Sequence, residues 1–199
     1  MAPRRIGVLG GTFDPVHNAH LVAAVDARHG ARLDTVLLVV ANVPWQKAGG
    51  RAVTPAEDRF ALVEAVVADV EGLEASRLEI DRGGESYTAD TIEELDAAEP
   101  DAELFVIVGA DIIGRLDTWK RIDDLRRRAG LIVVNRPGII GGFSDEGWAH
   151  GIQIVDIPGL AISGTDIRSR LVAGRPVDGL VPPAALRLIR DRGLYAGPG

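Results

Sequence analysis

Short, continuous apolar runs alternate along the chain with longer segments whose apolar residues recur at helical spacing. The runs at 35–40 and 131–135 have no polar interruption, as is typical of strands that are buried on both faces of a parallel sheet. The segment 18–29 carries its apolar residues three and four positions apart, which is typical of a helix covering such a sheet. The alternation predicts an α/β fold, a doubly wound parallel sheet with helices on both faces.

The same pattern predicts bounds for each element. Strands are expected at 6–9, 35–40, 103–108, 131–135 and 152–157, with a strand or pair of strands at 73–80. Helices are expected at 18–29, 55–68, 88–97, 110–116, 119–127, 163–173 and 183–191. Loops are expected at 44–54 and in the Gly-rich stretch 138–147. No repeat or boundary divides the chain, so residues 1–199 are predicted to form a single domain with 183–195 as its closing C-terminal helix.

Composition removes several classes of function. The 199 residues include 22 basic and 29 acidic side chains, which gives a net charge of −7 and argues against DNA or RNA as a partner. The lack of cysteine excludes disulfides, thiolate metal sites and thiol nucleophiles. The apolar runs are far shorter than the ~20 residues that span a bilayer, and no signal-peptide pattern opens the chain. We therefore expect a cytoplasmic protein with no membrane association.

The turn after the first strand carries unusual chemistry. Residues 10–20 read Gly-Gly-Thr-Phe-Asp-Pro-Val-His-Asn-Ala-His, which lacks both the Gly-x-Gly-x-x-Gly dinucleotide fingerprint and a P-loop. Gly10 and Gly11 allow a ligand to approach the backbone closely, and His17 and His20 lie on one face of the helix that follows. A metal pair, a phosphate clamp and incidental surface polarity all remain open for these histidines. The glycine turn and the helix N-terminus favour an anion.

A second polar cluster opens the helix expected at 163–173. Residues 162–168 read Ile-Ser-Gly-Thr-Asp-Ile-Arg. Ser163 and Asp166 alone would fit an ordinary capping box. Hydroxyls and an arginine at a helix N-terminus also make a phosphate cradle. Because the fold brings strand ends together, the presence of the first cluster favours the phosphate interpretation.

Both clusters resemble the signatures of the nucleotidylyltransferase superfamily. Residues 11–20 are similar to the motif that carries a His-x-x-His or Thr-x-x-His phosphate site, with Ala19 where the family has glycine. Residues 162–168 are similar to the Ile-Ser-Ser-Thr-x-Ile-Arg motif, with Gly164 in place of the second serine. The resemblance implies a Rossmann-like nucleotidyltransferase fold.

The middle of the chain resembles one branch of that superfamily, the bacterial nicotinate mononucleotide adenylyltransferases. The similar segments are Ser-Tyr-Thr-Ala-Asp-Thr at 86–91, Gly-Ala-Asp at 109–111 followed by Trp119, Asn-Arg-Pro-Gly at 135–138, and Pro-Trp-Gln-Lys at 44–47. The likeness runs from residue 6 to about residue 195. It implies adenylyl transfer from ATP to nicotinate mononucleotide, with nicotinate adenine dinucleotide and pyrophosphate as products.

The resemblance also implies a role for individual residues. The catalytic set is His17, His20, Lys47 and Arg168. The ATP-binding set is Gly10, Gly11, Thr12, Phe13, His17, His20, Gly109, Asp111, Ile162, Ser163, Thr165 and Arg168. The set that binds the acceptor nucleotide is Trp45, Tyr87, Thr88, Asp90, Trp119 and Arg136. Mg²⁺ is implied as a cofactor held mainly by the ATP phosphates and water, with no metal ligands from the protein. A homo-oligomer is possible.

Each residue in the middle of the chain also has a plain structural interpretation. Trp119 fits core packing as well as a stacking platform at the start of a helix, and Asp111 fits a helix cap as well as a ribose ligand. Tyr87 and Thr88 fit a simple helix start, and Asp14 is expected to hold its turn through local backbone N–H groups. Two other functions remain open: a sister enzyme acting on nicotinamide mononucleotide or pantetheine phosphate, and a non-catalytic paralogue that only binds nucleotides.

Overall fold

The core of the protein is a parallel sheet whose strand order reverses at its centre. In this computed structural model, which describes residues 2–44, 53–135 and 147–196, the order is β3-β2-β1-β4-β5-β6 with every pair parallel. The strands are β1 (Arg5–Gly11), β2 (Thr35–Val40), β3 (Leu73–Ser76), β4 (Glu103–Gly109), β5 (Ala129–Asn135) and β6 (Ile152–Asp156). The chain winds outward from β1 in one direction and from β4 in the other, so the carboxyl ends of these two strands flank the switch point where ligands bind in such sheets. The predicted doubly wound α/β fold is confirmed.

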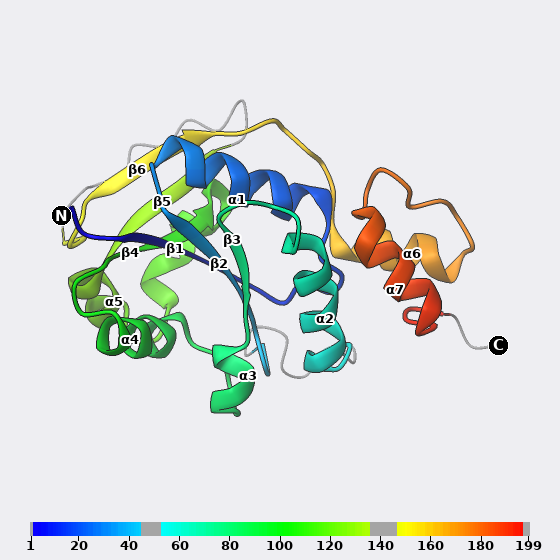
Figure 1. Cartoon of the computed structure of the whole chain (residues 1–199), viewed down its shortest axis with the longest axis horizontal. Coiled ribbons are helices and arrows are strands. Elements are labelled where there is room, and N and C mark those ends of the chain that lie inside the picture. The colour runs from blue at the N-terminus through cyan, green and yellow to red at the C-terminus, as the bar shows by residue number, and fades with distance from the viewer. Residues whose placement is uncertain (1, 45–52, 136–146, 197–199) are drawn as a thin grey trace.

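Helices cover both faces of the sheet, and two apolar clusters mark these faces (Figure 1). The larger cluster joins α1 (Asn18–Gly30), α2 (Ala56–Val67), α6 (Gly164–Val172) and α7 (Pro183–Asp191) to one face. The smaller cluster joins α4 (Thr88–Ala98), the 3₁₀ helix η2 (Ala110–Thr118) and α5 (Ile122–Arg128) to the other face. The continuous apolar strands are therefore buried on both sides, as their lack of alternation predicts.

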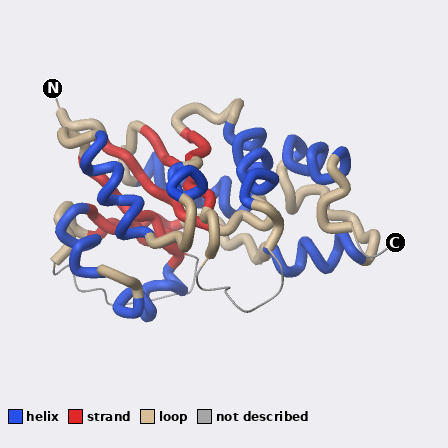
Figure 2. Tube along the Cα trace, turned by 90° about the horizontal axis from the view of Figure 1, so that it is seen from below, coloured by secondary structure: helices blue, strands red, loops and turns tan. Residues whose placement is uncertain are grey.

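The C-terminal helices extend this fold beyond the sheet. Helices α6 and α7 lie at one end of the molecule, where α7 packs against α2 (Figures 1 and 2). This arrangement brings the N-terminus of α6 next to the turn between β1 and α1, because the Arg168 side chain of α6 donates a hydrogen bond to the Asp14 carbonyl oxygen of that turn. The two sequence clusters, more than a hundred residues apart, thus meet.

Two expected elements are wrong in the structure. The strand prediction for 73–80 holds only for Leu73–Ser76, because 78–82 forms the short helix α3 (Leu78–Arg82). The helix expected at 119–127 begins only at Ile122, and Trp119 precedes it in extended conformation. The helix does not extend back to Trp119 because Arg121 has a left-handed backbone conformation, with φ 56°. The Arg121 side chain forms ion pairs with Asp90, Glu93 and Asp124, which hold this conformation in place. Helix α7 covers the predicted 183–191, and residues 192–195, the rest of the predicted closing segment, form turns.

Candidate active site

Three adjoining cavities lie around the carboxyl ends of β1 and β4. We name each by one lining residue: the Trp119 cavity, of about 240 Å³, the Asp111 cavity, of about 320 Å³, and the Arg168 cavity, of about 140 Å³. The Trp119 and Asp111 cavities share the lining residues Leu9 and Gly109. The Asp111 and Arg168 cavities share His17, His20 and Gly164. A bound molecule in one cavity is therefore next to a bound molecule in another.

The turn that leaves β1 brings its backbone close to these cavities. A Cβ atom at Gly10 would meet no atom within 4 Å, and Gly10 lines the Trp119 cavity, so open space lies over the backbone as the sequence predicts. Gly11 is crowded for a different reason: a Cβ there would lie 2.9 Å from the Phe13 ring. Phe13 itself is buried with φ 49°, and its ring packs edge-to-face with the His20 ring, with 4.9 Å between the ring centroids. Thr12 lines both the Trp119 and the Arg168 cavities.

The two histidines form a stacked pair at the start of α1. Their ring centroids are 3.6 Å apart with 15° between the planes. The backbone N–H of His17 donates to Nδ1 of His20 at 3.2 Å, so Nδ1 acts as an acceptor and the neutral ring carries its proton on Nε2. Because both rings line the Arg168 and Asp111 cavities, the pair presents imidazole nitrogens where these cavities meet.

The N-terminus of α6 forms the facing wall. The Ser163 hydroxyl caps the helix by accepting from the Asp166 N–H at 3.1 Å. Arg168 donates from Nη2 to the Thr165 hydroxyl at 3.0 Å and from Nη1 to the Asp14 carbonyl oxygen at 2.5 Å. The guanidinium is therefore already oriented at the Arg168 cavity, which both it and Thr165 line. Ile162 and Ser163 line the Asp111 cavity.

Gly164, the departure from the family motif, lies where α6 meets the β1–α1 turn. A Cβ atom there would lie 2.9 Å from the Asp14 carbonyl oxygen and 3.0 Å from Nη1 of Arg168. Both atoms belong to the hydrogen bond that joins the two motifs, and one of them is backbone. The absence of a side chain thus allows this contact to form.

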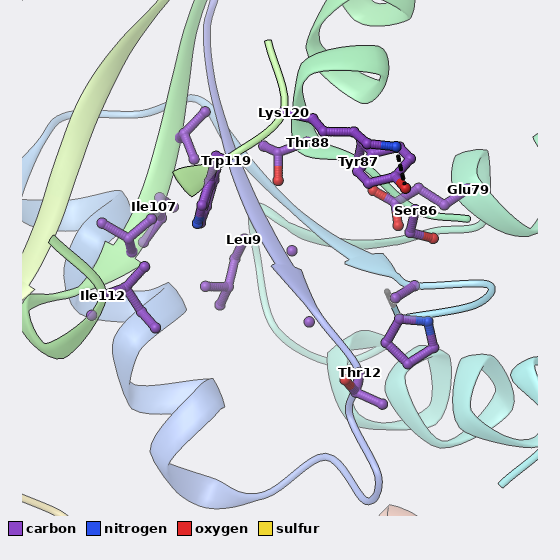
Figure 3. A pocket seen from close by; sticks show the side chains of 17 residues that line it. Leu9, Thr12, Glu79, Ser86, Tyr87, Thr88, Ile107, Ile112, Trp119 and Lys120 are labelled. Carbon is purple, nitrogen blue, oxygen red and sulfur yellow. Dashed lines mark hydrogen bonds between the residues drawn. The ribbon is translucent and has the colours of Figure 1, made fainter. Parts of the chain in front are cut away.

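The Trp119 cavity lies on the other side of the β1 carboxyl end. Figure 3 shows the Trp119 indole between Ile112 and Thr88, with its nitrogen turned toward Leu9. That Nε1 atom is buried and has no hydrogen-bond acceptor among the described residues. A flat apolar face with a buried donor beside it suits an aromatic ligand that carries polar substituents.

The N-terminus of α4 points into the same cavity. Ser86, Tyr87 and Thr88 line it, and the first backbone N–H groups of α4 have no acceptor within the helix. Lys120 also lines it and donates to the Tyr87 hydroxyl at 2.6 Å, the contact drawn in Figure 3, and this hydrogen bond raises the pKa of Lys120. The walls therefore combine apolar side chains with donors that favour an anion, and the one acidic side chain among the described lining residues, Glu79, already accepts from the Thr91 hydroxyl.

Not every residue implied by the resemblance lines a cavity. Asp111 does, and a Cβ at Gly109 would overlap its carboxylate, so the glycine lets Asp111 fold back toward the end of β4. Asp90 is not among the described residues that line the cavities, and its carboxylate binds Arg121 at 2.8 Å. Trp45, Lys47 and Arg136 lie outside the described residues, as does most of the loop expected at 138–147.

Two polar residues near the site escaped the sequence interpretation. Arg59 of α2 is 1% exposed and donates to three backbone carbonyl groups, and Tyr195 donates from its hydroxyl to Oδ1 of Asp14 at 2.9 Å. Asp14 is thus held by a partner 181 positions away, in addition to any local contact. An arginine on an amphipathic helix and a tyrosine after the last helix carry no sequence signal of such roles.

The described residues set limits on other chemistry. Within them, no group of three or more His, Asp or Glu side chains is arranged to hold a metal ion. None of the helices in these ranges combines the length and apolarity needed to cross a bilayer.

A doubly wound sheet with an imidazole pair and a helix N-terminus at its switch point defines a nucleotidyltransferase, and a cytidylyltransferase-like family model matches residues 8–170. Two relatives named "probable nicotinate-nucleotide adenylyltransferase" extend the match. The relative from Saccharopolyspora erythraea is 44% identical, and the match covers 98% of this chain and 91% of the relative. The relative from Streptomyces coelicolor is 46% identical, and the match covers 95% of this chain and 100% of the relative. The chain belongs to the nicotinate-nucleotide adenylyltransferase family.

A solved structure shares the fold. The nicotinic acid mononucleotide adenylyltransferase of Plasmodium falciparum, complexed with NaAD, superposes with a TM-score of 0.79 at 16% identity, covering 96% of this chain and 97% of that one. At this identity the likeness concerns the fold alone.

Proposed function

We propose that this protein transfers the adenylyl group of ATP to nicotinate mononucleotide, with nicotinate adenine dinucleotide and pyrophosphate as products. The observation that carries the proposal is the set of three adjoining cavities at the switch point, with the histidine pair where two of them meet. The dinucleotide product needs two nucleoside sites side by side with phosphates between them. The family to which the chain belongs carries the name of this activity.

The reaction is an in-line displacement at phosphorus. A phosphate oxygen of nicotinate mononucleotide attacks the α-phosphorus of ATP, the bond from this phosphorus to the bridging oxygen breaks, and pyrophosphate leaves with that electron pair. Such transfers depend on positioning and on stabilisation of charge, with little covalent chemistry for the protein. We therefore assign no nucleophile and no covalent intermediate.

His17 and His20 donate to the oxygens of the α-phosphate as charge accumulates there. In His20 the hydrogen bond to Nδ1 leaves Nε2 as the donor, so the ring needs no rearrangement before it acts. Gly10, Gly11, Thr12 and Phe13 shape the turn beside these phosphates.

The Arg168 cavity holds the β- and γ-phosphates. Arg168 presents a planar pair of donors, and Thr165 and the N-terminus of α6 add further donors to the same anion. We assign Lys47 to the same phosphates. The Asp111 cavity takes the adenosine: Asp111 accepts from a ribose hydroxyl, and Gly109, Ile162 and Ser163 form its walls.

The Trp119 cavity takes the acceptor. Its pyridine ring stacks on Trp119, and the ring carboxylate accepts from backbone N–H groups near Tyr87 and Thr88. Trp45 and Arg136 are assigned to the same nucleotide. Asp90 contributes indirectly, because its ion pair with Arg121 fixes the segment that follows Trp119.

Mg²⁺ fits the site as a companion of ATP. The described residues offer the Asp111 carboxylate but no cluster of ligands beside it, so the ion would sit mainly on phosphate oxygens and water. When bound, it offsets the charge of the leaving pyrophosphate.

The test is pyrophosphate release with ATP and each of three acceptors: nicotinate mononucleotide, nicotinamide mononucleotide and pantetheine phosphate. We expect the nicotinate compound to have the highest kcat/KM by a wide margin. Equal or faster release with another acceptor would reassign the substrate, and no release with any of them would leave a protein that binds nucleotides without catalysis.

A further inference from the structure

A cluster of buried polar side chains lies behind the turn that carries the histidines. Asp14 is 4% exposed and Arg59 is 1% exposed, and burial raises the pKa of Tyr195, which lies close to both. The three residues come from the β1–α1 turn, from α2 and from the segment after α7. Arg59 and Tyr195 are not among the described residues that line the three cavities.

Arg59 joins three parts of the backbone. It donates to the carbonyl oxygens of Thr12 at 2.8 Å, of Asn42 at 3.0 Å and of Thr54 at 2.7 Å. These carbonyls follow β1, follow β2 and precede α2. A single guanidinium therefore holds the end of the histidine turn against two neighbouring segments.

Asp14 is held from two sides. Its carboxylate accepts from the Tyr195 hydroxyl at 2.9 Å, and its carbonyl oxygen accepts from Arg168 at 2.5 Å. The negative charge of Asp14 also attracts the buried Arg59, which opposes the lowering of the Arg59 pKa by burial. Because Asp14 lies three residues before His17, its position sets where the histidine pair begins.

Apolar packing alone would not need such a cluster, since burying charged groups is costly unless they are paired and hydrogen-bonded. The bonds made here all end on the turn or on the segments beside it. The arrangement restrains the turn's backbone more tightly than side-chain packing would, which matters where catalysis depends on positions accurate to a fraction of an ångström.

On the basis of the proposed function, we propose that Tyr195 and Arg59 are positioning residues for adenylyl transfer. They act through Asp14 and Thr12 and hold the turn from which His17 and His20 reach the α-phosphate. Tyr195, in the segment after α7, thus supports catalysis from a distance, although it touches none of the reacting groups.

A second contact of the same C-terminal region supplies a control. Arg192, just after α7, donates to Asp58 of α2 at 2.8 Å, away from Asp14. Arg192→Gln loosens the C-terminal region without removing a bond to the turn, whereas Tyr195→Phe keeps the ring and removes only the hydroxyl. We expect Tyr195→Phe to lower kcat about tenfold, as the loss of a hydrogen bond to a charged group implies, with KM for nicotinate mononucleotide within about twofold. Arg192→Gln should leave kcat unchanged with at most a small loss of Tm, because its ion pair with Asp58 is partly exposed.

A double-mutant cycle tests whether Tyr195 acts through Asp14. Asp14→Ala with Tyr195→Phe should be no slower than Asp14→Ala alone, because each substitution removes the hydrogen bond from the Tyr195 hydroxyl to the Asp14 side chain. Independent, additive losses would overturn the proposal, as would a Tyr195→Phe enzyme with kcat within twofold of the unsubstituted protein.

Pyrophosphate binding, followed by calorimetry, separates this proposal from the proposed function. We expect Tyr195→Phe to bind pyrophosphate several-fold more weakly than the unsubstituted protein and Arg192→Gln to bind it equally well, whichever acceptor the enzyme uses. Equal binding by Tyr195→Phe would overturn the positioning role. Failure of the unsubstituted protein to adenylylate nicotinate mononucleotide would instead overturn the proposed function.

Discussion

We expect the enzyme to prefer an acid over an amide because of the groups that line the Trp119 cavity. Nicotinate mononucleotide carries a carboxylate on the pyridine ring, and nicotinamide mononucleotide carries a neutral carboxamide of nearly the same shape. The first N–H groups of α4, at Thr88 and Ala89, have no acceptor within the helix, whereas the N–H groups of Asp90 and Thr91 already donate to the Tyr87 carbonyl oxygen. We expect the ring carboxylate to accept from these N–H groups, of which Thr88 lines the cavity, whereas an amide would turn its NH₂ group toward one of them.

The magnitude is set by these two contacts. A hydrogen bond to a charged acceptor contributes roughly 1.5–3 kcal/mol, and a buried donor left without an acceptor costs a similar amount. Two such effects give about 3 kcal/mol or more, which corresponds to a preference of at least about a hundredfold in kcat/KM at 1.36 kcal/mol per factor of ten. The exposed Lys120 ammonium at the rim of the cavity also attracts the carboxylate, and this attraction is screened by salt.

The assay compares kcat/KM for the two substrates at one concentration of ATP and magnesium. Lys120→Met should reduce the ratio of kcat/KM for the acid to kcat/KM for the amide by less than about tenfold. We expect this effect only at low ionic strength, because the charge of Lys120 is exposed. Trp119→Leu should lower kcat/KM for both substrates alike, because stacking does not depend on the ring substituent. Equal values for acid and amide in the unsubstituted enzyme would refute the role assigned to α4, and a large change of the ratio in Trp119→Leu would refute the stacking argument.

Three further substitutions test the other cavities and the turn. His20→Ala should lower kcat about a hundredfold with a smaller effect on KM for ATP, because a donor to transition-state charge is lost; steady-state kinetics with near-normal kcat would contradict the assignment. Arg168→Lys should raise KM for ATP clearly with little loss of Tm, since an ammonium cannot replace both donors of the guanidinium; an unchanged KM would make Arg168 purely structural. Arg59→Met should lower the free energy of unfolding in urea by about 3 kcal/mol, because it leaves three partly buried backbone carbonyl groups without their donor; a loss below about 1 kcal/mol would show that water or other groups satisfy them.

The strands and their arrangement were predictable because burial on both faces leaves a direct trace in the sequence. In β5 every residue from Ala129 to Val134 is buried, and the corresponding apolar run is unbroken. By contrast, the sequence did not show that β3 ends at Ser76 and that α3 follows it. Glu79 of α3 is buried as a carboxylate that accepts from the Thr91 hydroxyl at 2.7 Å, so a polar residue occupies an interior position that hydropathy assigns to the surface.

The residues that hold the site in place depend on distant partners. Arg121 takes a left-handed backbone conformation, and two of its ion-pair partners, Asp90 and Glu93, lie on α4. Its local sequence predicts a continuing helix, which is why Trp119 was expected at a helix start. Arg59 and Tyr195 likewise reach carbonyl and carboxylate groups of the β1–α1 turn, 47 and 181 positions away. No periodicity or local spacing encodes such pairs, whereas the motifs at 11–20 and 162–168 can be read because their chemistry is local.

The sequence predicts that the two motifs come together at the strand ends, and in the structure a direct hydrogen bond joins them. Arg168 of the second motif donates to the carbonyl oxygen of Asp14 in the first, and Gly164 permits the approach because a Cβ there would lie 2.9 Å from that oxygen. The departure from the family pattern therefore need not weaken the site. The motif loses one hydroxyl at Gly164, but the guanidinium lies against the histidine turn. The arginine assigned to the leaving pyrophosphate is therefore bonded directly to the turn that carries the histidines assigned to the α-phosphate.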